Sequence, residues 1–186
     1  AMLLGYGNLI GTDSSEKAIE DTKKNMAWMK QNFQFSIFNF SPYGRSPVGR
    51  KSNLNFQFYK LDATKLNEKL RPESVDCIIT EPYLGKPLNG KESLEELNSQ
   101  ARELKNLYLS AFKQFSKILK KDGAIVFIIP RFKLRDQWVA VNCRKEIENL
   151  GFAVEKMWDQ HEFLLYHRPQ QFVGREIWKF IKQSSS

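Results

Sequence analysis

The sequence contains few cysteines and histidines and no long apolar segment. Its 186 residues include only two cysteines and two histidines, and the widely separated cysteines form neither a disulfide framework nor a metal-binding pattern. No apolar run approaches the ~18 residues of a membrane-spanning helix. The single thiols Cys77 and Cys143 indicate a reducing, cytoplasmic setting. We therefore expect neither a metal nor a membrane among the partners.

Acidic residues are also scarce relative to basic ones. Lys and Arg number 29 against 21 Asp and Glu, which gives a formal net charge of +8 and favours a polyanionic partner. The 41% of apolar and 27% of charged residues exclude disorder and coiled coil as the main description. The length predicts one domain over residues 1–186, with an exposed loop at 41–53 and a flexible tail at 183–186.

Strand-like and helix-like segments alternate along the chain, a pattern typical of an α/β fold around a mostly parallel sheet. Predicted strands occupy residues 8–13, 54–61, 75–80, 124–129 and 152–158, with one or two more within 162–181. Predicted helices occupy residues 14–31, 93–120 and 136–150. A capping box at Ser93 and Glu96 begins the long helix, Pro130 ends the strand at 124–129, and Gly151 closes the third helix.

Three of the predicted strands end in acidic residues, namely Asp13, Asp62 and Glu81. Ligands of open α/β sheets bind beyond the carboxyl ends of the strands. One carboxylate there can accept two hydrogen bonds from a ribose diol, a second polar end can read adenine, and a third can hold a reacting group. Each acid alone is equally well explained as a helix cap or a solvated turn. The three together favour a nucleoside-binding site.

Residues 80–85, Thr-Glu-Pro-Tyr-Leu-Gly, are the most distinctive motif. They resemble the Asp/Asn-Pro-Pro-Tyr motif of S-adenosylmethionine-dependent methyltransferases that act on exocyclic amines of bases. With residues 11–14, 62–63, 165–169 and 175–177, they make the chain similar to the S-adenosylmethionine-dependent RNA methylase family. That family includes the THUMP-associated tRNA guanine-N2 methyltransferases, and the resemblance covers nearly the whole chain.

The resemblance implies a Rossmann-like class I methyltransferase sheet with helices on both faces and an antiparallel C-terminal strand. It implies methyl transfer from S-adenosyl-L-methionine to an exocyclic amine, with guanine N2 in tRNA as the substrate. The implied catalytic residues are Glu81, Pro82 and Tyr83. Glu81 and the Pro82 carbonyl would accept hydrogen bonds from the amine, and Tyr83 would stack on a flipped-out base. The implied cofactor-binding residues are Asp13, Ser14, Asp62, Ala63 and Glu81.

Two basic clusters would then contact RNA phosphates. The first consists of Arg45, Arg50 and Lys51 in the loop at 41–53, and the second of Arg131, Lys133 and Arg135. The second cluster follows the strand that Pro130 is predicted to end, so we expect it near the carboxyl edge of the sheet. The simpler interpretation of either cluster is solvated surface charge.

The chain departs from the family pattern in two places. The motif here has Glu and a single proline, where the family has Asp or Asn and two prolines. The family's first strand and glycine-rich cofactor loop would precede Asn8 by about thirty residues, and the sequence has only seven there. We therefore expect the first strand to be missing and an unpaired sheet edge to promote a homodimer. Gly5, Gly7 and Gly11 lack the spacing of a dinucleotide fingerprint.

Two alternatives to RNA methylation stay open. The same acidic Pro-Tyr motif serves DNA amino-methyltransferases. The absent glycine-rich loop is also compatible with a catalytically inert, truncated methyltransferase domain that acts only as a nucleic-acid-binding or interaction module.

Overall fold

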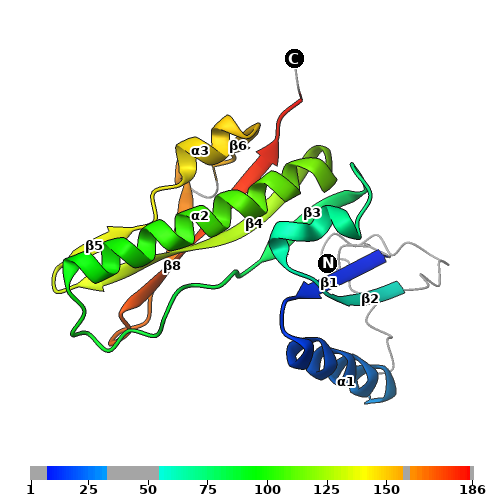
Figure 1. Ribbon diagram of the computed structural model, residues 1–186, viewed down its shortest axis with the longest axis horizontal. Coiled ribbons are helices and arrows are strands. Elements are labelled where there is room, and N and C mark those ends of the chain that lie inside the picture. The colour runs from blue at the N-terminus through cyan, green and yellow to red at the C-terminus, as the bar shows by residue number, and fades with distance from the viewer. Residues whose placement is uncertain (1–7, 33–54, 157–159, 185–186) are drawn as a thin grey trace, which may run out of the picture. The chain divides into compact units, whose positions relative to one another are not determined.

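The computed structural model describes residues 8–32, 55–156 and 160–184, and the chain divides into two compact units, residues 1–63 and 64–186 (Figure 1). We call them unit 1 and unit 2. The loop predicted at 41–53, with its residues Arg45, Arg50 and Lys51, lies outside the described residues.

Unit 1 contains a strand–helix–strand segment, as the sequence predicts. Strand β1 (Asn8–Asp13) pairs in parallel with β2 (Asn55–Lys60), in register from the first residue of each to the last. Between them runs helix α1 (Glu16–Asn32), which contacts both strands. The helix begins here because Ser15 Oγ accepts a hydrogen bond from the Ala18 amide at 3.3 Å, a bond typical of a helix N-cap.

Unit 2 is built on a six-stranded mixed sheet. Its strands are β3 (Val75–Thr80), β4 (Leu119–Leu134), β5 (Gln137–Ala140), β6 (Phe152–Val154), β7 (Phe163–Tyr166) and β8 (Val173–Lys182). The main order is β3-β4-β8-β6, with β5 paired to β4 and β7 paired to β8. Only β3 and β4 run parallel; the other pairs are antiparallel, including the predicted C-terminal strand β8.

Two α-helices accompany this sheet, α2 (Leu94–Ile118) and α3 (Arg144–Asn149), and a short 3₁₀ helix, η3 (Ala63–Glu68), precedes β3. The predicted capping box is confirmed, because Ser93 Oγ accepts from the Glu96 amide while the Glu96 carboxylate accepts from the Ser93 amide. No helix among the described residues is long and apolar enough to cross a membrane.

The core of unit 2 forms where α2 packs on β4. Phe112 of the helix is fully buried and meets three aromatic rings of the sheet edge-on. Its ring centroid lies 5.0 Å from that of Phe127 and 5.3 Å from those of Phe152 and Phe180. These edge-to-face contacts join α2 to β4, β6 and β8, so they fix the helix that carries several site residues described below.

The prediction that Pro130 ends its strand is wrong, because β4 runs on to Leu134. Lys133 donates its amide to Phe172 of the neighbouring segment at 2.8 Å. Amide directions alternate along a strand, so the nitrogen of Pro130 faces away from β8, toward the edge of β4 that pairs with β3 and β5. Pro130 lies after the last residue of β4 that pairs with β3 and before the first that pairs with β5. The missing N–H of proline therefore breaks no ladder hydrogen bond there.

The helix predicted at 136–150 is confirmed only in its second half. Residues 137–140 form β5, which returns along β4 after a turn in which Arg135 has φ 52°. Trp138 and Val139 are an aromatic and a β-branched residue, two types that favour a strand once β4 extends far enough to pair with them. Only Arg144–Asn149 is helical, and Gly151, with φ 90°, follows its end as the sequence predicts.

Candidate active site

The four predicted cofactor-binding residues of unit 1 lie at one edge of its sheet. Asp13 is the last residue of β1, and Asp62 and Ala63 follow the end of β2. Because the two strands are parallel and in register, their carboxyl ends meet. Asp13 Oδ1 accepts a hydrogen bond from the Ser15 amide at 2.7 Å, so this carboxylate also helps to begin α1. All four residues, Ser14 included, are exposed.

The predicted catalytic turn of unit 2 begins with an ion pair. Glu81 directly follows β3, and its Oε1 accepts a hydrogen bond from Nε of Arg175 in β8 at 2.7 Å. Both side chains remain partly exposed, Glu81 by 48% and Arg175 by 32%. An arginine from a strand far away in sequence therefore orients the acid of the Glu-Pro-Tyr motif. We call this contact the open pair.

The same turn is anchored from the opposite end by a buried tyrosine. Tyr108 of α2 donates its hydroxyl hydrogen to the backbone carbonyl of Tyr83 at 2.7 Å. Burial raises the pKa of Tyr108, so its hydroxyl stays protonated and remains a donor. The ring of Tyr83 is itself 59% exposed, which leaves a flat aromatic face available at the end of β3.

The segment after the motif is held against α2 by a glutamine. Gln100 Oε1 accepts a hydrogen bond from the Lys86 amide at 3.0 Å. Gly85 adopts φ 100°, and a Cβ there would lie 2.7 Å from Gln100 Nε2, so only glycine fits this close approach. A cavity of about 110 Å³ lies beside this contact, lined by Tyr83, Gly85, Lys86, Gln100, Glu103, Leu104 and Leu107.

Arg131, predicted to bind nucleic acid, is instead engaged inside unit 2. Its Nη2 lies 2.6 Å from Oε1 of Glu176, and these side chains are 22% and 6% exposed. The guanidinium carbon lies 5.8 Å from the ring centroid of Trp138 and 5.4 Å from that of Phe163. The indole of Trp178 donates to the other carboxylate oxygen of Glu176 at 2.9 Å. We call this contact the buried pair.

The other basic residues of the second cluster are differently placed. Lys133 lies near the end of β4 opposite Trp138 of β5, and Arg135 lies in the turn between these strands. Both side chains are exposed, so they are available to a partner.

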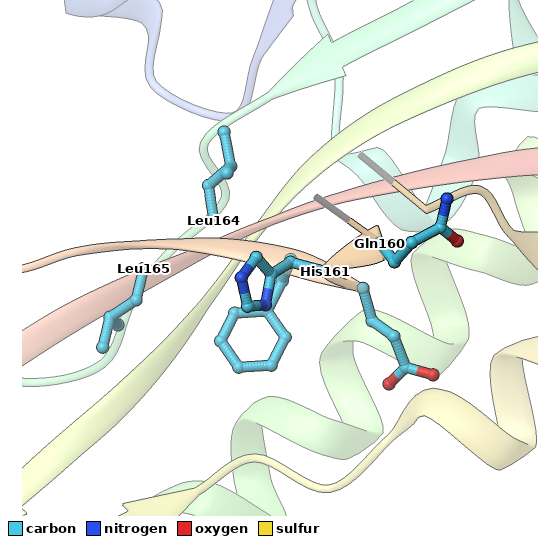
Figure 2. A pocket seen from close by; sticks show the side chains of 6 residues that line it. Gln160, His161, Leu164 and Leu165 are labelled. Carbon is cyan, nitrogen blue, oxygen red and sulfur yellow. The ribbon is translucent and has the colours of Figure 1, made fainter. Parts of the chain in front are cut away.

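A shallow hollow of about 490 Å³ lies along β7, and among the described residues those that line it are 160–165 (Figure 2). Leu164 and Leu165 point to opposite sides of the strand, as neighbours in an extended chain do (Figure 2). No predicted site residue lines this hollow, so it adds nothing to the candidate site. In the described ranges, no group of three or more His, Cys, Asp or Glu side chains gathers to hold a metal.

Sequence reasoning missed three residues that build the site, namely Arg175, Tyr108 and Gln100. Arg175 belongs to the family resemblance but has no expected role there, and the other two belong to a helix whose spacing predicts only a packing face. A contact such as Arg175 with Glu81 joins residues 94 positions apart, so it depends on strand order that periodicity cannot supply.

No protein-family model and no curated protein matches the chain. Solved structures do match it. NSun6 from Pyrococcus horikoshii is similar with a TM-score of 0.59 and 14% identity, over 99% of this chain and 44% of that one. A SAM-dependent methyltransferase from Methanosarcina mazei is similar with a TM-score of 0.55 and 10% identity, over 96% of this chain and 83% of that one. A protein from Clostridium thermocellum proposed to be an rRNA methylase is similar with a TM-score of 0.50 and 12% identity, over 95% of this chain and 73% of that one.

These likenesses define the class of fold. The chain has the Rossmann-like α/β fold of methyltransferases, with an antiparallel C-terminal strand, as the sequence predicts. It spans less than half the length of the Pyrococcus protein.

Proposed function

We propose that this chain transfers a methyl group from S-adenosyl-L-methionine to an exocyclic amine of a nucleic-acid base, guanine N2 in tRNA. The observation that carries the proposal is the Glu81-Pro82-Tyr83 turn at the end of β3, held by Arg175 and by Tyr108. It occurs on a methyltransferase fold, at the strand end where ligands of such sheets bind.

The chemistry explains these residue types. An exocyclic amine is a poor nucleophile because its lone pair is delocalised into the ring. Acceptors placed against its N–H groups orient the remaining lone pair toward the methyl donor, so positioning provides most of the catalysis. Glu81 Oε2 and the Pro82 carbonyl are the proposed acceptors. The exposed ring of Tyr83 offers the face on which a flipped-out base stacks.

The residues at the edge of unit 1 fit the proposed cofactor. Asp13 ends β1 and Asp62 follows β2, its parallel neighbour, so two exposed carboxylates stand at one sheet edge, where a ribose diol needs acceptors. Ser14 and Ala63 are the adjacent positions from which the adenosine moiety is contacted. The cofactor supplies an electrophilic methyl group on a sulfonium.

Nucleic-acid contact is proposed for Lys133 and Arg135, the exposed members of their cluster, and for Arg45, Arg50 and Lys51. The net charge of +8 supports a polyanionic partner. For Arg131, the ion pair with Glu176 supports an additional role in stability.

Self-association is a further part of the proposal. Within the described part of unit 1, β1 and β2 have only each other as strand partners. Unpaired strand edges invite pairing with another chain. Light scattering over a range of concentrations should therefore find a homodimer, and a monomer at every concentration would contradict this part.

The test of the main proposal combines cofactor binding with methyl transfer. Calorimetry should detect S-adenosyl-L-methionine binding at micromolar strength, and radiolabelled transfer should occur to tRNA. Transfer to duplex DNA alone would replace the RNA substrate by DNA. Absence of cofactor binding at millimolar concentration would defeat the enzymatic function and favour an inert nucleic-acid-binding module.

A further inference from the structure

The open pair presents unused hydrogen-bonding groups at the end of β3. Arg175 uses Nε to hold Glu81 Oε1, and among the described residues neither side chain makes another hydrogen bond. The two terminal nitrogens of Arg175 are thus available as donors, and Glu81 Oε2 as an acceptor. Both side chains are partly exposed, and the exposed ring of Tyr83 belongs to the same turn.

We propose that Arg175 and Glu81 together recognise the Watson–Crick edge of guanine, with Arg175 donating to O6 and Glu81 accepting from N1–H and the N2 amine. The inference rests on the proposed methyl transfer to a base amine and adds Arg175 as the residue that determines which base is taken. Arg175 is a specificity residue, because it contacts O6 and takes no part in the transfer itself.

The order of the groups carries the inference. From Arg175 through Glu81 Oε1 to Oε2 the pair offers a donor, an acceptor that keeps a lone pair free, and a second acceptor. The edge of guanine offers the complementary order of acceptor, donor and donor, in O6, N1–H and the N2 amine. Adenine and cytosine place a ring-nitrogen lone pair beside their amine, and that lone pair would face a carboxylate oxygen. Only guanine satisfies all three groups.

The pair also explains why a glutamate serves in place of the shorter acid of the family motif. Its carboxylate is shared with an arginine that stands on β8, in line with Pro130 of β4. A guanidinium holds its donors in a rigid planar fork, so fixing Nε on Glu81 also fixes the direction of the terminal nitrogens. Glu81 thereby both reads the base and orients the reacting amine.

Equilibrium binding of short RNAs tests this assignment without requiring turnover. The probes are fluorescein-labelled, uridine-rich single strands with one central guanine, 2-aminopurine or adenine, measured by anisotropy. 2-Aminopurine keeps the amine of guanine but lacks O6 and N1–H. The wild-type chain should bind the guanine strand about tenfold more tightly than the other two, as expected for a base edge read by paired hydrogen bonds.

Three variants locate the discrimination. Arg175→Met should weaken binding of the guanine strand about tenfold and leave the 2-aminopurine strand unchanged, while Arg175→Lys should restore part of the loss. Glu81→Gln, which presents one acceptor and one donor, should shift the preference toward adenine. The matched control is Lys179→Gln. It breaks the Lys179–Glu155 ion pair of 2.7 Å on the same strand, away from Glu81, and should change nothing.

The outcomes separate this inference from the proposed function. Equal weakening of all strands by Arg175→Met would overturn the inference, because it would make Arg175 a phosphate contact. A wild-type chain that binds the three strands equally, or binds none, would overturn it as well. Arg175-dependent guanine binding without methyl transfer to any nucleic acid would uphold the inference and defeat the proposed reaction. Transfer without guanine preference would do the reverse.

Discussion

Two arginine–glutamate pairs use neighbouring residues of β8, and their surroundings differ completely. Arg175 meets Glu81 in the open pair, where both side chains remain partly in solvent. Glu176 meets Arg131 in the buried pair, between Trp138 and Phe163 and against the indole of Trp178. Successive residues of a strand point to opposite faces of the sheet, so the two pairs, which have the same charged groups, lie in different environments.

The difference shows how burial determines what an arginine–glutamate pair can do. A charge removed from water is costly without an opposite charge beside it, so the buried pair is committed to the fold. An exposed pair contributes little to stability, because water screens it, and its remaining donors and acceptors are free to meet a ligand. Charge in the sequence therefore does not distinguish an arginine that is committed to the fold from one that can meet a ligand, whereas the exposure of its partner helps to do so.

The largest expected effect is the loss of methyl transfer when Glu81 of the open pair is changed. Glu81→Gln keeps the shape of the side chain but replaces an acceptor oxygen by a donor. Methyl transfer should fall roughly 10²–10⁴-fold, the range found when a positioned catalytic carboxylate is lost. Cofactor binding measured by calorimetry should weaken far less than transfer does, because the other four proposed cofactor-binding residues are unchanged. Turnover at the wild-type rate would remove Glu81 from the reaction.

The next largest effect is on the stability of the buried pair. Arg131→Met leaves the carboxylate of Glu176 buried without its partner and should lower the free energy of unfolding by about 3–5 kcal/mol. The double variant R131M/E176L removes both charges and should recover most of that loss. Urea unfolding measures both. A single variant as stable as wild type would show that Arg131 is not committed to the fold.

A smaller effect is expected where the catalytic turn meets α2. Tyr108→Phe removes the hydroxyl that holds the Tyr83 carbonyl, which should cost about 1 kcal/mol of unfolding free energy and lower transfer less than Glu81→Gln does. Ser110→Ala is the control, since it removes a hydrogen bond to Asn106 within the same helix. Equal transfer by the two variants would show that the turn does not depend on Tyr108.

The smallest effect is on the stability of the open pair. Arg175→Met should change the free energy of unfolding by at most about 1 kcal/mol, because the ion pair it breaks is partly exposed. Urea unfolding beside Arg131→Met gives the comparison directly. A loss as large as that of Arg131→Met would erase the distinction between the pairs.

Much of the fold could be predicted from the sequence where local signals act alone. The strand at 75–80 and the capping box at Ser93 depend on neighbours in the chain, and both are confirmed. The prediction for the segment after Pro130 is wrong because the structure of that segment depends on a distant strand. Because β4 pairs with β8 on both sides of the proline, it continues past Pro130. Residues 137–140 then pair with the extended β4 as β5 and do not form a helix.

The candidate site divides along the same line. The motif Glu81-Pro82-Tyr83 is visible in the sequence, because its residues are consecutive. Its supports are not, since Arg175, Tyr108 and Gln100 reach the turn only through the strand order and the packing of α2. The ion pair of Arg131 could not be predicted from the sequence for the same reason. Its partner Glu176 is 45 positions away, and nothing local distinguishes a buried arginine from an exposed one.

Methyl transfer by two double variants tests the central claim most directly. E81Q/R175M removes the charges of the open pair, and R131M/E176L removes those of the buried pair. Each is assayed on tRNA with radiolabelled S-adenosyl-L-methionine, with rates corrected for the folded fraction. The account predicts that the first variant folds but loses transfer at least about 100-fold, while the second keeps transfer near the wild-type rate. Full transfer by E81Q/R175M, or none by the wild-type chain, would contradict it.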